Sequence, residues 1–201
     1  MKVRTLGLVA YVPTWRAMQA FNAARDESTE DQLWLVEHPP VFTLGLAGRR
    51  EHVLDPGSIP VVATDRGGQV TYHGPGQAVI YTMLDLRRRK LGAKELVRRI
   101  EQAVMDALDS YGIDAARRTG MPGVYVGEAK IAAIGLRIAR GGSYHGVALN
   151  NDLDLAAFSR IDPCGYPGLV STRLADHGVR DNTENVHARL AASLGKCLTP
   201  P

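Results

Sequence analysis

The chain has 201 residues, 45% of them hydrophobic and 22% charged, which is typical of a globular protein with a sizeable core. The formal net charge is only +3, and the two cysteines, Cys164 and Cys197, form no CxxC pair, so neither a disulfide framework nor a zinc cluster is indicated. No apolar run reaches the roughly 20 residues that cross a bilayer, and the N-terminus lacks the features of a signal peptide. We therefore expect one cytoplasmic domain over residues 1–201.

The first part of the chain has the pattern of strands with one inserted helix. Residues 6–12 and 33–36 are rich in residues that favour strands. Between them an apolar stripe at helical spacing predicts a helix, with its members at Ala17, Ala20, Phe21 and Ala24. The glycines, prolines and charges of residues 45–60 predict a loop. Further strands are predicted at residues 41–44, 61–62, 70–72 and 78–84.

The second part contains the clearest helix and a meander of strands. The helix is predicted from apolar residues that recur at three and four positions, namely Leu96, Ile100, Ala103, Val104, Ala107 and Tyr111. Gly112 ends it as a C-cap. Strands are predicted at 124–126, 130–138 and 143–149, and helices at 155–158 and 183–194. Together these elements predict an α+β fold, a mixed and mostly antiparallel sheet with helices packed on it.

Three glycine-containing clusters are candidate ligand sites, at residues 66–77, 130–135 and 162–168. Glycine permits close backbone approach and exposes N–H groups to a ligand. The first cluster has neither the spacing of a P-loop nor that of a dinucleotide-binding loop, so nucleotide phosphate binding is not supported. A hairpin turn with structural glycines explains such a cluster equally well when it stands alone.

Cys164 is the sharper candidate, because Pro163 and Gly165 place it in a turn from which a side chain can project into a cleft. A free thiol has a pKa of about 8.5, so a nucleophilic cysteine needs a nearby cation or helix N-terminus. Lys130 is the candidate partner, since it begins an apolar strand whose burial favours the neutral amine. An inert buried thiol and a solvated lysine are the alternatives for the two residues taken singly.

The six histidines include no pair at a metal-ligand spacing, so we expect no metal site. His73 and His145 are each followed by glycine at a predicted strand end. Either residue is explained as polar lining of a site or as a structural histidine, and a dyad with the cysteine stays open.

Four motifs in order resemble those of the lipoyl(octanoyl) transferases. They are RGGQVTYHGPGQ at residues 66–77, KIAAIGLRI at 130–138, SYHGVALN at 143–150 and DPCGYPG at 162–168. That family shares its catalytic-domain fold with the biotin and lipoate protein ligases. The resemblance implies the same fold here and a single octanoyltransferase catalytic domain that needs no cofactor.

The resemblance also implies a two-step reaction. An octanoyl group passes from acyl carrier protein to Cys164 as a thioester and then to a lysine of an acceptor, and Lys130 lowers the thiol pKa and serves in acid and base steps. The implied acceptors are lipoyl domains of 2-oxoacid dehydrogenase complexes and the glycine cleavage H protein, with no nucleic acid or membrane partner. The implied substrate-binding residues are Arg66, Gly67, Gly68, Gln69, Val70, Thr71, Tyr72, His73, Ala133, Ile134, Gly135, Gly146, Val147 and Ala148.

Burying an octanoyl chain gains roughly 5 kcal/mol at about 0.8 kcal/mol per CH₂, so we expect a dry apolar tunnel lined by Ala133 and Val147. The basic cluster at residues 87–90 is a candidate docking patch for acidic partner proteins. Two other functions are weighed against acyl transfer. One is an ATP-dependent lipoate or biotin protein ligase, against which the DPCGYPG turn argues, and the other is a non-catalytic module that binds lipoyl domains.

Overall fold

The structure is a computed structural model that describes residues 1–166 and 168–199, and the side chain of Cys164 lies outside what it describes. Its centre is a sheet in the order β1-β2-β6-β10-β9-β8-β7. The strands of this sheet are β1 (Lys2–Leu8), β2 (Gln32–Glu37), β6 (Gln77–Met83), β7 (Ala116–Arg118), β8 (Met121–Val126), β9 (Ala129–Ala139) and β10 (Gly142–Asn150). All neighbouring pairs are antiparallel except β1 and β2.

A second, smaller sheet has the order β4-β3-β5 and lies beside the first. It consists of β3 (Val41–Leu44), β4 (Val61–Ala63) and β5 (Val70–His73). Its apolar side packs on η2 (Leu155–Arg160), with Phe42, Tyr72 and Ile161 among the buried residues of that cluster. The short helices η1 (Arg50–His52), η3 (Pro163–Gly165) and η4 (Leu174–His177) lie in the connecting segments.

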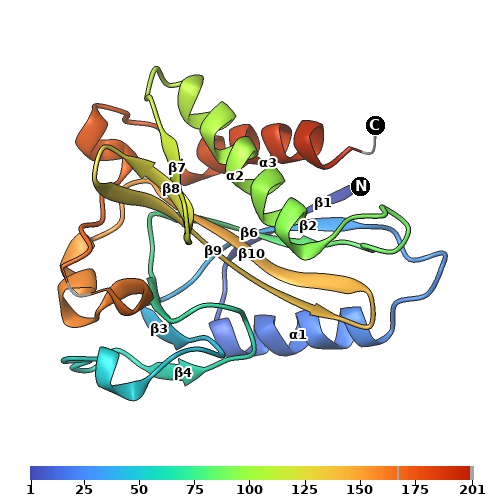
Figure 1. Ribbon diagram of the computed structural model, residues 1–201, viewed down its shortest axis with the longest axis horizontal. Helices are drawn as coiled ribbons and strands as arrows, with labels where there is room; N and C mark the ends of the chain where they lie inside the picture. Colours follow the sequence, from blue (N-terminus) through green and yellow to red (C-terminus); the bar gives the residue numbers. More distant parts are fainter. Residues whose placement is uncertain (167, 200–201) are drawn as a thin grey trace.

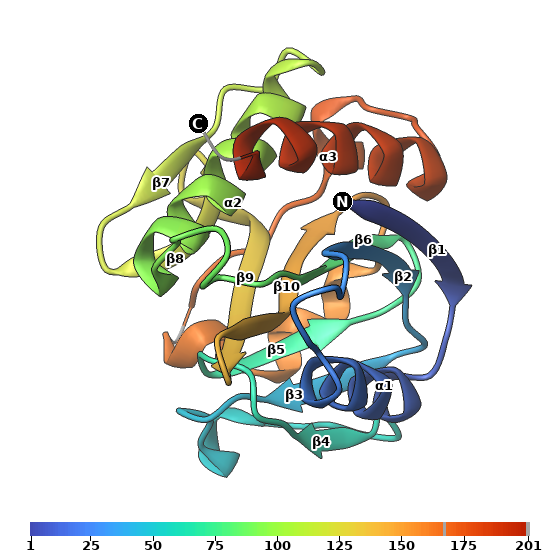
Figure 2. The same cartoon turned by 90° about the vertical axis from the view of Figure 1, so that its right-hand side faces the viewer.

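Helices cover both faces of the large sheet, as Figures 1 and 2 show. On one face α2 (Ala93–Asp109) and α3 (Thr183–Leu198) enclose the largest core cluster, which includes Leu96 and Leu190. On the other face α1 (Tyr11–Ala23) packs through Met18. Strand β6 is buried along its whole length because it lies between these two layers. Its nearly continuous apolar run is typical of a strand covered on both faces.

The predicted α+β class is confirmed, and so are most elements beyond residue 30 within a few residues at each end. The start of the chain differs from the prediction. Residues 6–12 do not form one strand, because β1 ends at Leu8 and α1 begins at Tyr11. The predicted stripe of Ala17, Ala20 and Ala24 faces solvent.

The buried face of α1 is formed instead by Tyr11, Thr14, Met18 and Asn22, which also lie at spacings of three and four residues. Alanine buries little apolar area, so the larger Met18 side chain decides which face packs on the sheet. Two polar members of this face donate to backbone carbonyls: Thr14 to Ala10 within the helix, and Asn22 to Ala139 at the end of β9. No helix among the described residues has the length and apolar character to cross a membrane.

Candidate active site

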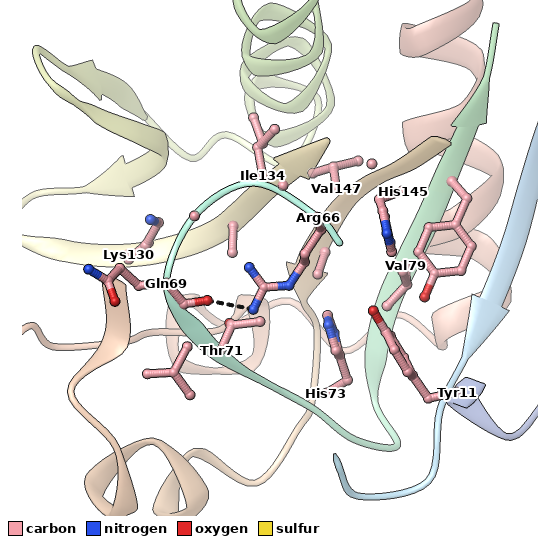
Figure 3. Close-up of a pocket in the computed structure, with 17 residues that line it drawn as sticks. Tyr11, Arg66, Gln69, Thr71, His73, Val79, Lys130, Ile134, His145 and Val147 are labelled. Atoms are coloured by element: carbon pink, nitrogen blue, oxygen red, sulfur yellow. Dashed lines mark hydrogen bonds between the residues drawn. The ribbon is translucent and has the colours of Figure 1, made fainter. Parts of the chain in front are cut away.

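A narrow cavity of about 50 Å³ lies between the large sheet and the loop that precedes β5. Figure 3 shows the side chains around it. Its lining comes from α1, from strands β5, β6, β9 and β10, and from that loop, and comprises Tyr11, Arg66, Gly68, Gln69, Val70, Thr71, His73, Val79, Tyr81, Lys130, Ala133, Ile134, Gly135, His145, Gly146, Val147 and Ala148. A wider cavity of about 540 Å³ adjoins it and shares Gly68, Gln69, Lys130, Ile134 and Gly135.

The two ends of the narrow cavity differ, and we name them by position. The outer end is where the two cavities meet, at Gln69, Lys130, Ile134 and Gly135. The inner end is formed by Tyr11, His73, Tyr81 and His145, all of which are buried. An extended ligand that enters at the outer end therefore lies between β9 and the loop and points toward α1.

Glycines let the loop approach the sheet. A Cβ atom on Gly135 would lie 3.1 Å from the Gly67 carbonyl oxygen, and the Gly67 N–H donates to the Leu136 carbonyl at 2.8 Å. On the neighbouring strand, a Cβ on Gly146 would lie 2.1 Å from the Ile80 oxygen. These contacts explain why the first glycine cluster and the strand residues of the second and third motifs meet at one place.

Arg66 fixes the shape of this loop from inside. Its guanidinium donates to the Thr43 side chain at 3.0 Å from Nε, to the Gly67 carbonyl at 2.9 Å and to the Gln69 carbonyl at 2.7 Å. The side chain is 7% exposed. Because its donors serve backbone carbonyls, Arg66 holds the loop in the curve that forms one wall of the cavity.

Lys130 lies at the start of β9 and is 6% exposed. Its ammonium donates to the Pro122 carbonyl at 2.8 Å and lies 5.4 Å from the centre of the Tyr125 ring. Gly123, with φ of +131°, makes room for it, because a Cβ there would lie 2.4 Å from the Lys130 Cε atom. The β8–β9 hairpin therefore positions the lysine side chain at the outer end.

Backbone pairing brings the segment after the DPCGYPG turn to the same lysine. The Lys130 N–H donates to the Val170 carbonyl at 2.8 Å, and the Thr172 N–H donates to the Lys130 carbonyl at 3.0 Å. At the other end of this segment, η3 packs so that a Cβ on Gly165 would lie 3.1 Å from the Gln69 side chain. Tyr166 lines the wider cavity together with Lys130. Cys164 belongs to η3, and its side chain lies outside the described part of the molecule.

Beside the inner end, the Asp65 side chain links α1 to β10 through hydrogen bonds. Its carboxylate accepts hydrogen bonds from Trp15 at 2.7 Å, from Gln19 at 3.0 Å, from His145 at 2.8 Å and from the Tyr144 hydroxyl. Burial alone would raise the pKa of Asp65, but the hydrogen bonds, led by those from His145 and Tyr144, hold that pKa below its usual range. His145 has φ of +61°, a strained conformation for a histidine within a strand.

The imidazoles of the inner end are neutral. Burial lowers the pKa of His38 to about 4 and that of His73 to about 3, and it also lowers the pKa of His145. His38 donates from Nδ1 to the Val9 carbonyl at 2.6 Å and accepts from the Tyr81 hydroxyl at 2.6 Å. The histidines at the inner end, and His38 behind Tyr81, are therefore buried and neutral, while the Asp65 carboxylate bonded to His145 is ionised.

The structure gathers the predicted substrate-binding residues around the narrow cavity, apart from Gly67 and Tyr72. Gly67 lines the wider cavity instead. Tyr72 is one residue out of phase with Thr71 and His73 on β5, so its ring packs on Phe42 and Phe158 on the other side of the strand, which is a core position away from the cavity. Three lining residues, Tyr11, Val79 and Tyr81, were not predicted, and His145 was named in advance as either polar lining of a site or a structural histidine. Only His145 carried a sequence signal, since it stands within the third motif.

The sequence matches the lipoyl protein ligase A/B catalytic domain family over residues 10–195. The chain belongs to this family. An octanoyltransferase of Laribacter hongkongensis is 56% identical over 201 residues, covering all of this chain and 97% of the relative. An octanoyltransferase of an Azoarcus species is 57% identical over 199 residues, covering 98% of this chain and 88% of the relative. The first of these matches covers every residue that lines the cavity.

Solved structures of this fold include a lipoate-protein ligase A bound with ATP, with a TM-score of 0.78, 18% identity and coverage of 98% of this chain and 86% of that one. A biotin protein ligase of Aquifex aeolicus in complex with biotin and ATP has a TM-score of 0.62, 12% identity and coverage of 98% and 70%. At such identities the likeness concerns the fold, which confirms the predicted ligase-type catalytic domain.

Proposed function

We propose that this family member is an octanoyltransferase of protein lipoylation that carries its acyl group on Cys164. The observations that support the proposal lie at the outer end of the cavity: Lys130 pairs with residues 170–172, and Gly165 of η3, the turn that contains Cys164, packs against Gln69. The full-length relatives named octanoyltransferase support the acyl group and its transfer. The acyl carrier protein as donor and the lipoyl-domain lysine as acceptor follow from the resemblance of the motifs.

The first half-reaction is a thioester exchange. The Cys164 sulfur attacks the acyl carbon, a C–S bond to Cys164 forms, the C–S bond to the carrier breaks, and the proton of the Cys164 thiol passes to the leaving carrier thiolate. The two sulfur leaving groups are alike, so the exchange needs no ATP. The Lys130 ammonium stabilises a thiolate beside it and is a donor to the leaving sulfur.

The second half-reaction makes an amide. The acceptor amine attacks the Cys164 thioester, a C–N bond forms, the C–S bond breaks, and a proton from the amine is relayed to the Cys164 sulfur. Tetrahedral oxyanions form in both steps, and backbone N–H groups of the glycine-rich loop or of η3 are the available donors to them, each worth about 3 kcal/mol in other acyl transferases.

The function is tested by supplying octanoyl-carrier protein and a lipoyl domain without ATP. The expected result is an octanoylated acceptor, with Cys164→Ala inactive in both half-reactions. The likeness in fold to a ligase bound with ATP makes ATP-dependent activation of a free acid the second candidate. Transfer that requires ATP and free octanoate would support that candidate and contradict the first. Tight binding of the lipoyl domain without acylation would indicate a non-catalytic module.

A further inference from the structure

The hydroxyl of Tyr11 is buried at the inner end of the cavity. Tyr11 begins α1 and is 4% exposed, and among the described residues its hydroxyl makes no hydrogen bond of ordinary distance and angle, with the Thr64 hydroxyl as its polar neighbour. The neighbouring Thr64 hydroxyl donates instead to the Leu44 carbonyl at 3.2 Å. In Figure 3 the Tyr11 oxygen points into the space bounded by Arg66, His73 and His145. A buried hydroxyl without such a bond is unusual, because the large majority of buried side-chain polar atoms have a hydrogen-bond partner.

The His73 ring beside it presents an acceptor. The two rings are stacked, with centroids 5.7 Å apart and an angle of 14° between them. Gln77 uses its amide nitrogen to donate to Asn150 at 2.9 Å, so its oxygen accepts from His73 Nδ1 at 2.7 Å. Because burial lowers the His73 pKa to about 3, the ring is neutral and its Nε2 atom keeps a lone pair.

His145 has the complementary tautomer. Its Nε2 donates to Asp65 at 2.8 Å, and the neutral ring keeps its lone pair on Nδ1. The inner end thus combines an O–H donor with imidazole acceptors. The walls between it and Lys130 are apolar by comparison, formed by Val79, Ala133, Ile134, Val147 and Ala148.

We propose that Tyr11 is a specificity-determining residue that limits the length of the acyl chain, an inference that rests on the proposed function. Apolar walls accept methylene groups, whereas the inner end is satisfied by water. A chain that stops short of Tyr11 leaves that water in place. A longer chain displaces the water and leaves the buried hydroxyl and imidazole nitrogens without partners, which is costly in proportion to the number of groups left unsatisfied.

The test compares acyl transfer from octanoyl-carrier and decanoyl-carrier protein. In Tyr11→Phe the ratio of kcat/KM for decanoyl over octanoyl is expected to rise about tenfold, because the ring is kept and the hydroxyl is removed. Thr14→Val is the matched control: it removes a buried hydroxyl from the same helix, one that donates to the Ala10 carbonyl at 2.8 Å and does not line the cavity. In this control the ratio is expected to stay as in the wild type.

For an acyl chain that ends in a hydroxyl, Tyr11→Phe is expected to change the kcat/KM ratio in the opposite direction. An 8-hydroxyoctanoyl donor places its own hydroxyl at the inner end, so its use relative to octanoyl is expected to fall about tenfold in Tyr11→Phe. Wild-type transfer of octanoyl with both ratios unchanged in Tyr11→Phe would overturn the inference. Absence of octanoyl transfer by the wild type would instead contradict the proposed function, which separates the two failures.

Discussion

The outer and inner ends of the cavity are built by different means. At the outer end, backbone pairing holds Lys130 against residues 170–172, the segment that follows η3, and several of the lining residues are half exposed. At the inner end, buried side chains of β5, β6 and β10 are held by side-chain hydrogen bonds to Gln77, His38 and the Asp65 carboxylate. In the proposed function the outer end is the place of acyl transfer, and in the further inference the inner end selects the length of the acyl chain.

Among the substitutions at the outer end, only loss of Cys164 should reduce the acylation rate more than Lys130→Ala. We expect acylation at pH 7 to fall about 100-fold or more, with partial recovery at higher pH as the thiol ionises unaided near its own pKa of about 8.5. The measurement is a rapid-quench acylation rate from pH 6 to 9. Lys196→Ala is the control, since Lys196 is an exposed lysine in α3. A wild-type rate for Lys130→Ala at pH 7 would remove the role of Lys130.

Gly123→Ala tests whether the placement of Lys130 matters as much as its charge. The added Cβ would lie 2.4 Å from Lys130 Cε, so the lysine must move, and we expect a loss of activity of about tenfold or more. Gly127→Ala is the matched control in the same hairpin. Gly127 also has a positive φ, of +53°, but a Cβ there meets nothing within 4 Å, so it should cost about 1 kcal/mol of stability without loss of kcat. Equal activities in the two variants would contradict the account.

His38→Gln tests whether the imidazole behind Tyr81 at the inner end is neutral in the folded protein. Because the folded pKa of His38 is about 4 and a free histidine titrates near 6.5, the unfolded state binds more protons between these values. The free energy of unfolding should therefore fall as the pH drops from 6.5 to 4. His38→Gln should reduce this slope by up to about 1.4 kcal/mol per pH unit, measured by urea unfolding at several pH values.

Tyr81→Phe is the control for that experiment. It removes the hydrogen bond to His38 at 2.6 Å and keeps the imidazole. The variant should be less stable at every pH and retain a slope close to that of the wild type. A slope that His38→Gln leaves unchanged would mean that His38 is not the group that titrates.

A substitution in the basic cluster at residues 87–90 should have the smallest effect on the transfer reaction. Arg88 and Arg89 are paired with Asp31, at 2.8 Å and 2.5 Å, and so serve the fold. Arg87 packs beside Gly141 in the β9–β10 turn, and Lys130 is at the opposite end of β9, ~30 Å away at about 3.3 Å per residue. We expect Arg87→Glu to change KM for the carrier protein by less than about twofold at physiological salt. A large rise in KM would support the docking patch that the sequence predicts at residues 87–90.

The sequence predicts the fold well where the signal is local. The periodicity of α2 and the close spacing of the strand runs β9 and β10 around a glycine turn depend on residues that are neighbours in the chain. Helix α1 was predicted with the wrong buried face, because alanine spacing competes there with the burial of Met18 and with hydrogen bonds to distant residues such as Asp65. Its register follows from tertiary contacts, not from propensity.

The residues of the site likewise divide into those that the sequence predicts and those that only the packing reveals. Its motif residues could be named in advance because they recur together in one family, whereas Tyr11, Val79 and Tyr81 line the cavity only through the way α1 and β6 pack. The pairing of Lys130 with residues 170–172 joins segments about forty residues apart and has no local signature. Tyr72 shows the limit of motif transfer, since alternate residues of a strand face opposite sides.

The most direct test of the acyl-enzyme is the intact mass of the protein after incubation with octanoyl-carrier protein in the absence of ATP. An octanoyl adduct is expected on the wild type and on Cys197→Ala. The Cys197 thiol of the wild type lies in α3 beside Asp106. No adduct is expected on Cys164→Ala. An adduct that persists in Cys164→Ala, or one that forms only with ATP, would contradict transfer through Cys164.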